Sequence, residues 1–325
     1  MAFRNWRQAS HSQRLAALGV VMVFLLTGAA LAQPGLQTPN GDEASLVAGS
    51  IDLDLNSYPD DHARSIDAID VARLAAKRGM RAIVLKNHYE PTAGIAYVVQ
   101  KAVPGVQVFG GIVLNRPQGG INPAAVEHMA HLIGGQGKVV WMPTLDAEND
   151  VRFHKENRPT VPVQRNGELL PEVREVIGLV AKYDLVLETG HLSPEEGLLV
   201  LREAKRQGVK HMVMMQPLVM PAFMTVTQMH EAVALGAYIE FAGGAPNGRG
   251  GGERMKTFAE AIRAVGVEHC VLSTDLGQPN SPLPPDGMAQ FLAALQQQGF
   301  TTQEIGVMAK ENPARLLGLN DAAQR

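Results

Sequence analysis

Short apolar runs rich in β-branched residues alternate along most of the chain with longer segments whose apolar positions recur at helical spacing. Several of these longer segments end in a glycine, which supplies the left-handed backbone conformation that terminates a helix. The short runs predict eight strands, at residues 50–56, 81–86, 106–115, 138–144, 184–190, 210–216, 238–243 and 269–275.

Eight strand–helix units in sequence predict a single-domain α/β fold, a (β/α)8 TIM barrel over residues 50–325. Strands covered on both faces explain why the apolar runs are continuous. The alternative is a doubly wound open sheet, which is weaker because no Gly-x-Gly-x-x-Gly sequence follows the first strand. In a barrel the functional side chains lie at the C-terminal ends of the strands, so the search for a site starts there.

The first 32 residues have a different pattern. Three arginines precede an apolar run from Leu15 to Ala32, and that run closes with the sequence Ala-Leu-Ala. This order is typical of a secretory signal peptide, so we expect residues 1–32 to be removed and the protein to be exported, periplasmic or secreted. The alternative is an uncleaved N-terminal helix that anchors the protein in the membrane. Residues 33–49 lack periodicity and predict a linker.

Composition narrows the choice of partners. Loss of the three arginines would change the net charge from −3 to 26 − 32 = −6, which argues against nucleic acid as a partner. The single cysteine, Cys270, cannot form an internal disulfide. We expect a small-molecule substrate and no stable membrane association after cleavage. The sequence leaves the oligomeric state open, a homo-oligomer included.

Polar side chains follow nearly every predicted strand. In the first strand Asp52, Asp54 and Asn56 recur at period two, which predicts that they share one face. Because the strand ends of a barrel meet at one mouth, we expect the following residues to converge there: Asp54, Asn56, Lys86, His88, Asn115, Arg116, Thr144, Asp146, Glu188, His191, Gln216, Glu240 and Asp275.

Six segments carry a resemblance to a known family: VLKNHYEPT (84–92), FGGIVLNR (109–116), VVWMPTLDAEN (139–149), LETGHLSPEE (187–196), LSTDLGQ (272–278) and ENPARLLGL (311–319). Together they resemble the amidohydrolase superfamily of TIM-barrel hydrolases, and most of all a poorly characterised branch of it. The resemblance implies a divalent metal held by histidines after strands one, five and six and by an aspartate after strand eight. Such a metal would activate water for attack on an amide, ester or related bond.

The chain departs from that pattern at three ligand positions. Asp54 and Asn56 stand where the family has His-x-His, and Gln216 stands where it has the histidine of strand six. His191 and Asp275 remain in place. The resemblance then implies metal ligation by Asp54, Asn56, His88, His191, Gln216 and Asp275. It also implies catalytic roles for Asp275, His191 and Lys86 and substrate binding by Asn115, Arg116 and Glu188.

Two hypotheses follow from these replacements. In the first, the chain is an exported metal-dependent hydrolase of a small-molecule C–N or ester-type bond. Its oxygen-rich ligand set would favour Mn²⁺ or Mg²⁺ over Zn²⁺. In the second, the metal is lost, Asp54 and Asp275 pair with Lys86 or Arg116, and the protein is a non-catalytic ligand-binding barrel.

The connection over residues 145–171 is long and lacks a clear period. Connections of this length without secondary structure of their own are typically functional lids or disordered segments. We expect this one to be a lid that closes over the mouth of the barrel and brings Asn149, Arg152 or His154 to a substrate.

Overall fold

A computed structural model describes residues 45–243 and 251–319. The predicted signal peptide and most of the predicted linker lie outside these residues. Within the described part of the chain, no helix has both the length and the apolar character needed to cross a membrane.

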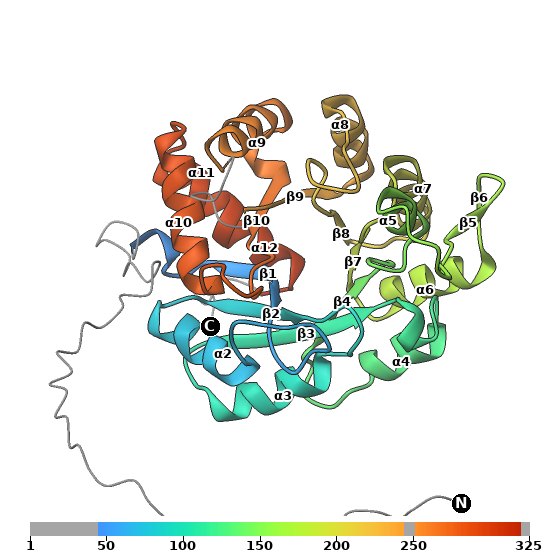
Figure 1. Cartoon of the computed structure of the whole chain (residues 1–325), viewed down its shortest axis with the longest axis horizontal. Coiled ribbons are helices and arrows are strands. Elements are labelled where there is room, and N and C mark those ends of the chain that lie inside the picture. The colour runs from blue at the N-terminus through green and yellow to red at the C-terminus, as the bar shows by residue number, and fades with distance from the viewer. Residues whose placement is uncertain (1–44, 244–250, 320–325) are drawn as a thin grey trace, which may run out of the picture. The chain divides into compact units, whose positions relative to one another are not determined.

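Eight parallel strands form one sheet in the order β1-β2-β3-β4-β7-β8-β9-β10, with helices between them along the chain (Figure 1). The strands are β1 (Ile51–Asn56), β2 (Ala82–Lys86), β3 (Gln107–Val113), β4 (Gly137–Trp141), β7 (Val186–Glu188), β8 (His211–Met214), β9 (Tyr238–Ala242) and β10 (Cys270–Ser273). The helices are α2 (Ala68–Lys77), α3 (Ala93–Ala102), α4 (Pro123–Ala130), α5 (Glu148–Phe153), α6 (Pro171–Lys182), α7 (Pro194–Arg206), α8 (Val226–Leu235), α9 (Gly251–Val265), α10 (Pro284–Gln297), α11 (Thr302–Gly306) and α12 (Asn312–Leu316), with single turns η1 (Arg116–Gln118), η2 (Val267–His269) and η3 (Val307–Glu311).

The first and last strands approach each other and bring the sheet close to closure. The amide of Asp275 donates to the carbonyl of Asp54 at 2.8 Å, and the amide of Asn56 donates to the carbonyl of Leu276 at 2.7 Å. The predicted (β/α)8 TIM barrel is therefore confirmed, with its eight strands in the predicted places.

Side chains of each strand divide between two apolar clusters, as the period of two requires. On β2, Ile83 and Leu85 pack in the large cluster that includes the helices, whereas Ala82 and Val84 belong to a smaller inner cluster. Residues of α12 pack against this inner cluster. Lys86 lies two residues after Val84 and therefore points to the same inner side of β2. The interior of the barrel is thus apolar along the strands and polar at their C-terminal ends.

The register of β1 changes within the strand, and this corrects one prediction. Ile51 and Leu53 both belong to the inner cluster, and the pairing with β2 shifts between Asp52 and Leu55. A shift of register, as at a β-bulge, breaks the alternation of the side chains. Asp54 and Asn56 join the strand-end network. Asp52 instead accepts hydrogen bonds from the Thr274 amide at 3.0 Å and hydroxyl at 2.6 Å, which ties β1 to the segment after β10.

The connection over residues 145–171 also differs from its prediction, because it carries regular structure. It contains α5 and a small antiparallel hairpin of β5 (Gln164–Arg165) and β6 (Glu168–Leu169). The amide of Val161 donates to the carbonyl of Asp146 at 2.7 Å, which holds this segment against the end of β4. The helix α5 supplies a side chain to the candidate site.

Candidate functional site

The centre of the site is an ion pair between adjacent strands. Lys86 Nζ at the end of β2 lies 2.6 Å from Asp54 Oδ2 on β1, and neither side chain is more than 1% exposed. Gln216 Nε2, which follows β8, donates to the same carboxylate oxygen at 3.4 Å. Desolvation raises the pKa of Asp54 to about 6 even though the nearby ammonium of Lys86 favours its ionised form. Burial opposes the charge of Lys86, but the attraction of Asp54 and Asp275 outweighs it, and the pKa of Lys86 is raised.

Asn56 joins the second carboxylate to this pair. Its Nδ2 donates to Asp275 Oδ1 at 3.1 Å, across the junction between the first and last strands. Asp275 has φ +50° and Gln216 has φ +44°, a backbone region that side-chain-bearing residues rarely adopt. Backbone strain of this sort gathers at binding and catalytic sites because the surrounding structure must hold it.

His191, in the loop between β7 and α7, is held by an acid from another element. Its Nδ1 lies 2.6 Å from Oδ2 of Asp150 on α5, and the Asp150 side chain is 5% exposed. Asn149 on the same helix donates to the carbonyl of His191 at 3.2 Å. Ser193 and Glu196 form a capping box at the start of α7, which fixes the loop from its other end. The ring of His191 is thereby oriented from several sides.

His88, two residues after β2, is oriented by a hydroxyl. Its Nδ1 lies 2.8 Å from Thr144 Oγ1, and the same oxygen accepts a hydrogen bond from Asn115 Nδ2 at 2.8 Å. Burial, aided by the positive charge of Lys86, holds the pKa of His88 well below its usual value, so the ring is neutral. The rings of His88 and His191 meet edge to face with centroids 5.9 Å apart.

Two glutamates form a deeper layer of the barrel. Trp141 Nε1 donates to Glu188 Oε2 at 2.7 Å, and Ser273 Oγ donates to Glu240 Oε1 at 2.6 Å. Complete burial, with repulsion from Asp54, raises the pKa of Glu188 to about 8, and burial raises that of Glu240 well above its usual value. Glu188 is therefore protonated near neutral pH and adds no negative charge to the site, and burial favours the neutral form of Glu240 as well.

The structure gathers seven of the predicted residues at the strand ends, in a network of three sets of contacts. These are Asp54 with Lys86 and Gln216, Asn56 with Asp275, and the edge-to-face rings of His88 and His191, with Asn115 and Glu188 beside them. Thr144 was expected at the mouth as a polar residue after a strand, although no role was predicted for it. Asp150 was not predicted, because it lies on a helix within the predicted lid.

Arg116 lies apart from this network, because its side chain is exposed and has no ion pair among the described residues. It lines a pocket of about 690 Å³ together with Tyr89, Asp146, Asp150 and Arg158. Asp146 accepts from the Arg116 amide at 2.8 Å and is paired with the guanidinium of Arg158. Asp150 belongs both to this pocket and to the His191 contact. The pocket therefore adjoins the candidate site.

The donor set does not fit the divalent metal that the resemblance implies. An ammonium and two amide NH₂ groups already face the carboxylates of Asp54 and Asp275. Nowhere in the barrel mouth, as far as the structure describes it, do three histidine or acidic ligand atoms lie within 4.8 Å of one another. Asp54 Oδ1 and Asn56 Oδ1 are buried without a hydrogen-bond partner in the described chain, and they are available to accept from a ligand.

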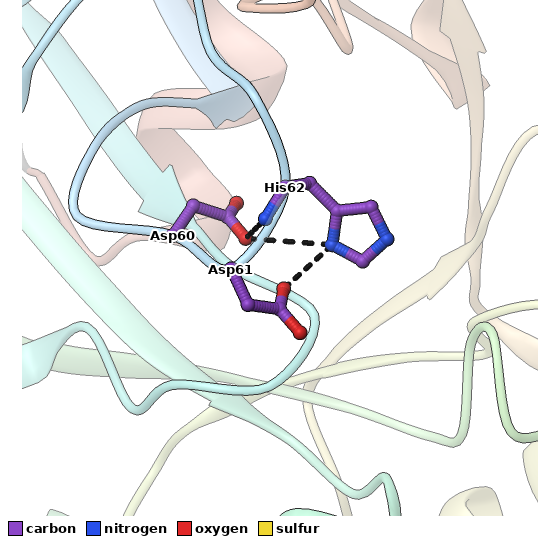
Figure 2. Close-up of side chains that lie close together, drawn as sticks. All are labelled: Asp60, Asp61 and His62. Carbon is purple, nitrogen blue, oxygen red and sulfur yellow. Dashed lines mark hydrogen bonds and ion pairs between the residues drawn. The ribbon is translucent and has the colours of Figure 1, made fainter. Parts of the chain in front are cut away.

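One cluster in the described residues does meet that spacing, and Figure 2 shows it: Asp60, Asp61 and His62 in the loop after β1. The His62 ring lies 2.6 Å from Asp61 Oδ1, and its amide donates to Asp60 Oδ1 at 3.0 Å. Arg64 Nε donates to the other oxygen of Asp60 at 2.6 Å. The cluster is partly exposed and its internal hydrogen bonds account for it.

Comparison with solved structures shows the fold that the resemblance predicted. An amidohydrolase from Pseudomonas aeruginosa matches with a TM-score of 0.57 and 13% identity, covering 85% of this chain and 98% of that one. An organophosphorus hydrolase from Deinococcus radiodurans matches with a TM-score of 0.54 and 15% identity, covering 88% and 100%. A 2,6-dihydroxybenzoate decarboxylase from Rhizobium matches with a TM-score of 0.55 and 14% identity, covering 84% and 99%.

These matches show the TIM-barrel fold that the resemblance to the amidohydrolase superfamily implies. No curated protein matches the chain. A family model does match, over residues 49–240, and its description is a family of unknown function, DUF6282. Because this match spans more than half of the chain, including six of the eight strands in full, the start of β9 and most of the site, the protein belongs to the DUF6282 family.

Proposed function

We propose that this protein is a hydrolase that cleaves an ester-type or C–N bond of a small polar molecule at the mouth of the barrel. The observation that carries the proposal is the pair of histidines, His88 and His191, whose rings meet 5.9 Å apart and whose Nδ1 atoms are held by different partners. The metal-dependent form of the reaction is not adopted, because the donor set does not fit a divalent ion.

His191 serves as the general base. The carboxylate of Asp150 can only accept, so the Nδ1 of His191 carries the proton and donates it to Asp150 Oδ2. The lone pair is then on Nε2, where it can take a proton from water. A buried carboxylate behind the ring also stabilises the imidazolium that forms when the proton arrives.

His88 presents the opposite tautomer. Asn115 Nδ2 must donate to Thr144 Oγ1, and the Thr144 hydroxyl proton has His88 Nδ1 as its acceptor among the described residues. The proton of the neutral His88 ring is therefore on Nε2, which makes this atom a hydrogen-bond donor. A neutral donor of this kind can stabilise an oxyanion without being consumed as an acid.

These roles combine into a balanced reaction. His191 Nε2 takes a proton from water as the water oxygen bonds to the substrate carbonyl carbon, and the C=O π pair moves to the oxygen that His88 Nε2–H binds. The tetrahedral intermediate collapses, the C–O or C–N bond breaks, and His191 returns its proton to the leaving group. Asp54 Oδ1 and Asn56 Oδ1 accept hydrogen bonds from polar groups of the substrate.

Substrate binding extends toward the pocket that Arg116 lines. Arg158 neutralises Asp146 and also contacts Glu156, and Asp150 is engaged by His191. The guanidinium of Arg116 is left as the charged group of this pocket without an ion-pair partner in the described chain. We therefore assign it to an anionic substituent of the substrate, which suits a guanidinium fork.

The proposal includes export, on the basis of the arginines and the apolar run within residues 1–32. N-terminal sequencing of the protein from the producing cell would test it. A mature chain that begins at Gln33 is the expected result, and a retained Met1 in the membrane fraction would favour the anchor instead.

The enzymatic proposal is tested with a panel of p-nitrophenyl esters, lactones and N-acyl amino acids. Turnover by the natural chain should fall by about 10²- to 10⁴-fold in His191→Ala, the range expected for loss of a general base. His230→Ala, an exposed histidine on α8, is the matched control and should keep full activity. Turnover that survives His191→Ala would refute the assignment of the base. Binding of panel compounds without any turnover would support the non-catalytic barrel.

A further inference from the structure

We infer that the ammonium of Lys86 takes the place of the divalent metal in this barrel, so that the mouth of the barrel binds no divalent ion. This goes beyond the proposed function, because it concerns what neutralises the carboxylates whether or not a substrate is turned over.

The first step of the argument is charge. Asp54 and Asp275 are the two carboxyl groups nearest to the ammonium of Lys86, and Lys86 Nζ lies 2.6 Å from Asp54 Oδ2 with its side chain 1% exposed. A buried carboxylate needs a cation close by, and here the protein supplies it from the next strand. A divalent ion bound at Asp54 Oδ2 would have to displace the ammonium or lie next to it, where the like charges repel each other.

Lys86 is also held where it is. It extends from the inner side of β2, above Ala82 and Val84, and its Nζ lies 6.0 Å from the centre of the Trp141 ring. The indole of Trp141 is itself fixed by its hydrogen bond to Glu188. The side chains packed around Lys86 therefore hold its ammonium next to the carboxylate of Asp54.

The second step concerns the two amides that replace histidines. Gln216 turns its Nε2 to Asp54, and Asn56 turns its Nδ2 to Asp275. An amide nitrogen is a donor with no lone pair for a metal, so both residues complete the neutralisation of the carboxylates by hydrogen bonding. Three N–H donors thus occupy Asp54 Oδ2 and Asp275 Oδ1, and a metal would have to compete with them for these two oxygens.

The third step is spacing. Ligands of a bound transition metal lie about 2.0–2.3 Å from the ion, so their atoms crowd within a few ångströms of each other. No three such atoms from histidine or acidic residues of the mouth do so in the described chain. His88 and His191 each hold a protein partner at Nδ1, and their ring centres are 5.9 Å apart.

The test is the ion content of the full chain, measured without substrate. The purified protein is incubated with Zn²⁺ or Mn²⁺, desalted, and analysed by mass spectrometry of the metals, and its Tm is recorded with each ion and with a chelator. We expect much less than one ion per chain and the same Tm in every condition. About one ion per chain, with a Tm that the ion raises and the chelator lowers, would overturn the inference.

A variant of Lys86 adds a test in which ion binding is the expected result. Lys86→Met leaves Asp54 and Asp275 without the ammonium, and the buried carboxylates should then recruit Mn²⁺, seen as an ion-dependent rise in Tm. Lys86→Met/Asp54→Asn is the matched control that lacks both charges and should not respond. A folded Lys86→Met that ignores Mn²⁺ would refute the role of Lys86 in excluding the ion. If Lys86→Met does not fold, Lys86→Gln is measured in the same way and the natural chain still decides the ion content.

The proposed function and this inference can fail separately. A natural chain that holds no ion and hydrolyses no panel compound would refute the hydrolase and leave the inference standing. A chain that hydrolyses panel compounds and holds one tightly bound ion would refute the inference and leave the assignment as a hydrolase standing.

Discussion

Asp150 Oδ2 lies 2.6 Å from His191 Nδ1, although 41 residues separate the two along the chain. Asp150 sits on α5, in the connection after β4, and His191 follows β7, which is paired with β4. The histidine that remains in the place where the family has a metal ligand is thus oriented by a residue that the sequence did not predict for the site.

The acid behind His191 should be needed for catalysis and not for folding. Asp150→Asn keeps the shape of the side chain, but its amide can also donate to Nδ1 and so favour the wrong tautomer of His191. We expect kcat to fall by about 10²-fold or more with little change in KM, because the proton transfer is impaired and not the binding. Steady-state kinetics on a panel substrate measure this. An unchanged kcat would show that Asp150 is structural.

The hydroxyl of Thr144 should set the tautomer of His88. Thr144→Val preserves the size of the side chain and removes the donor, whereas Thr144→Ser retains the hydroxyl. Nitrogen NMR of the histidine rings should show Nε2-protonated His88 in the natural chain and in Thr144→Ser, and a mixture in Thr144→Val. Nδ1-protonated His88 in the natural chain would reverse the role that we assign to this ring.

Removal of the central ammonium should destabilise the barrel. Lys86→Met leaves a buried carboxylate unpaired, and we expect a loss of about 3–5 kcal/mol in the free energy of unfolding without added metal. Lys210→Met is the matched control, because Lys210 pairs with Asp184 at the surface with its side chain 73% exposed. It should cost about 1 kcal/mol or less. Equal losses in urea unfolding of the two variants would contradict the importance of the buried pair.

Stability should decline as pH rises through neutrality. The folded pKa of Glu188 is raised to about 8 by burial, above its ordinary value of 4.5. Between these values the folded protein keeps a proton that the unfolded chain releases, so the contribution of Glu188 to the free energy of unfolding is greatest below pH 4.5 and falls until about pH 8. One such group contributes a slope of about −1.4 kcal/mol per pH unit.

Glu188→Gln cannot ionise and should flatten this slope between about pH 5 and 7. Glu203→Gln is the control, because the hydrogen bond from Arg206 lowers the pKa of Glu203 to about 2. Glu203 is therefore ionised in both states across this range, and its replacement should leave the slope unchanged. Urea unfolding at a series of pH values checks both variants. An equal slope in Glu188→Gln and the natural chain would show that Glu188 is ionised in the folded protein.

The sequence by itself determined the barrel. Eight buried parallel strands need side chains that are apolar on both faces, and those runs are visible without any tertiary information. It also determined which ends of the strands carry polar groups, because parallel strands of a barrel present their C-terminal ends at one mouth. Asp54, Lys86, His191 and Asp275 could therefore be expected to lie near each other.

Only the tertiary structure decided how these groups pair. A register shift in β1 separates Asp52 from Asp54, and backbone register cannot be derived from a period-two pattern that the shift interrupts. The contacts of Lys86 with Asp54, of Gln216 with Asp54 and of Asp150 with His191 depend on side chains from elements far apart in sequence. The sequence shows which charged residues are available at the mouth. Whether a carboxylate pairs with an ammonium or binds a metal depends on distances of a few ångströms, and packing determines those distances.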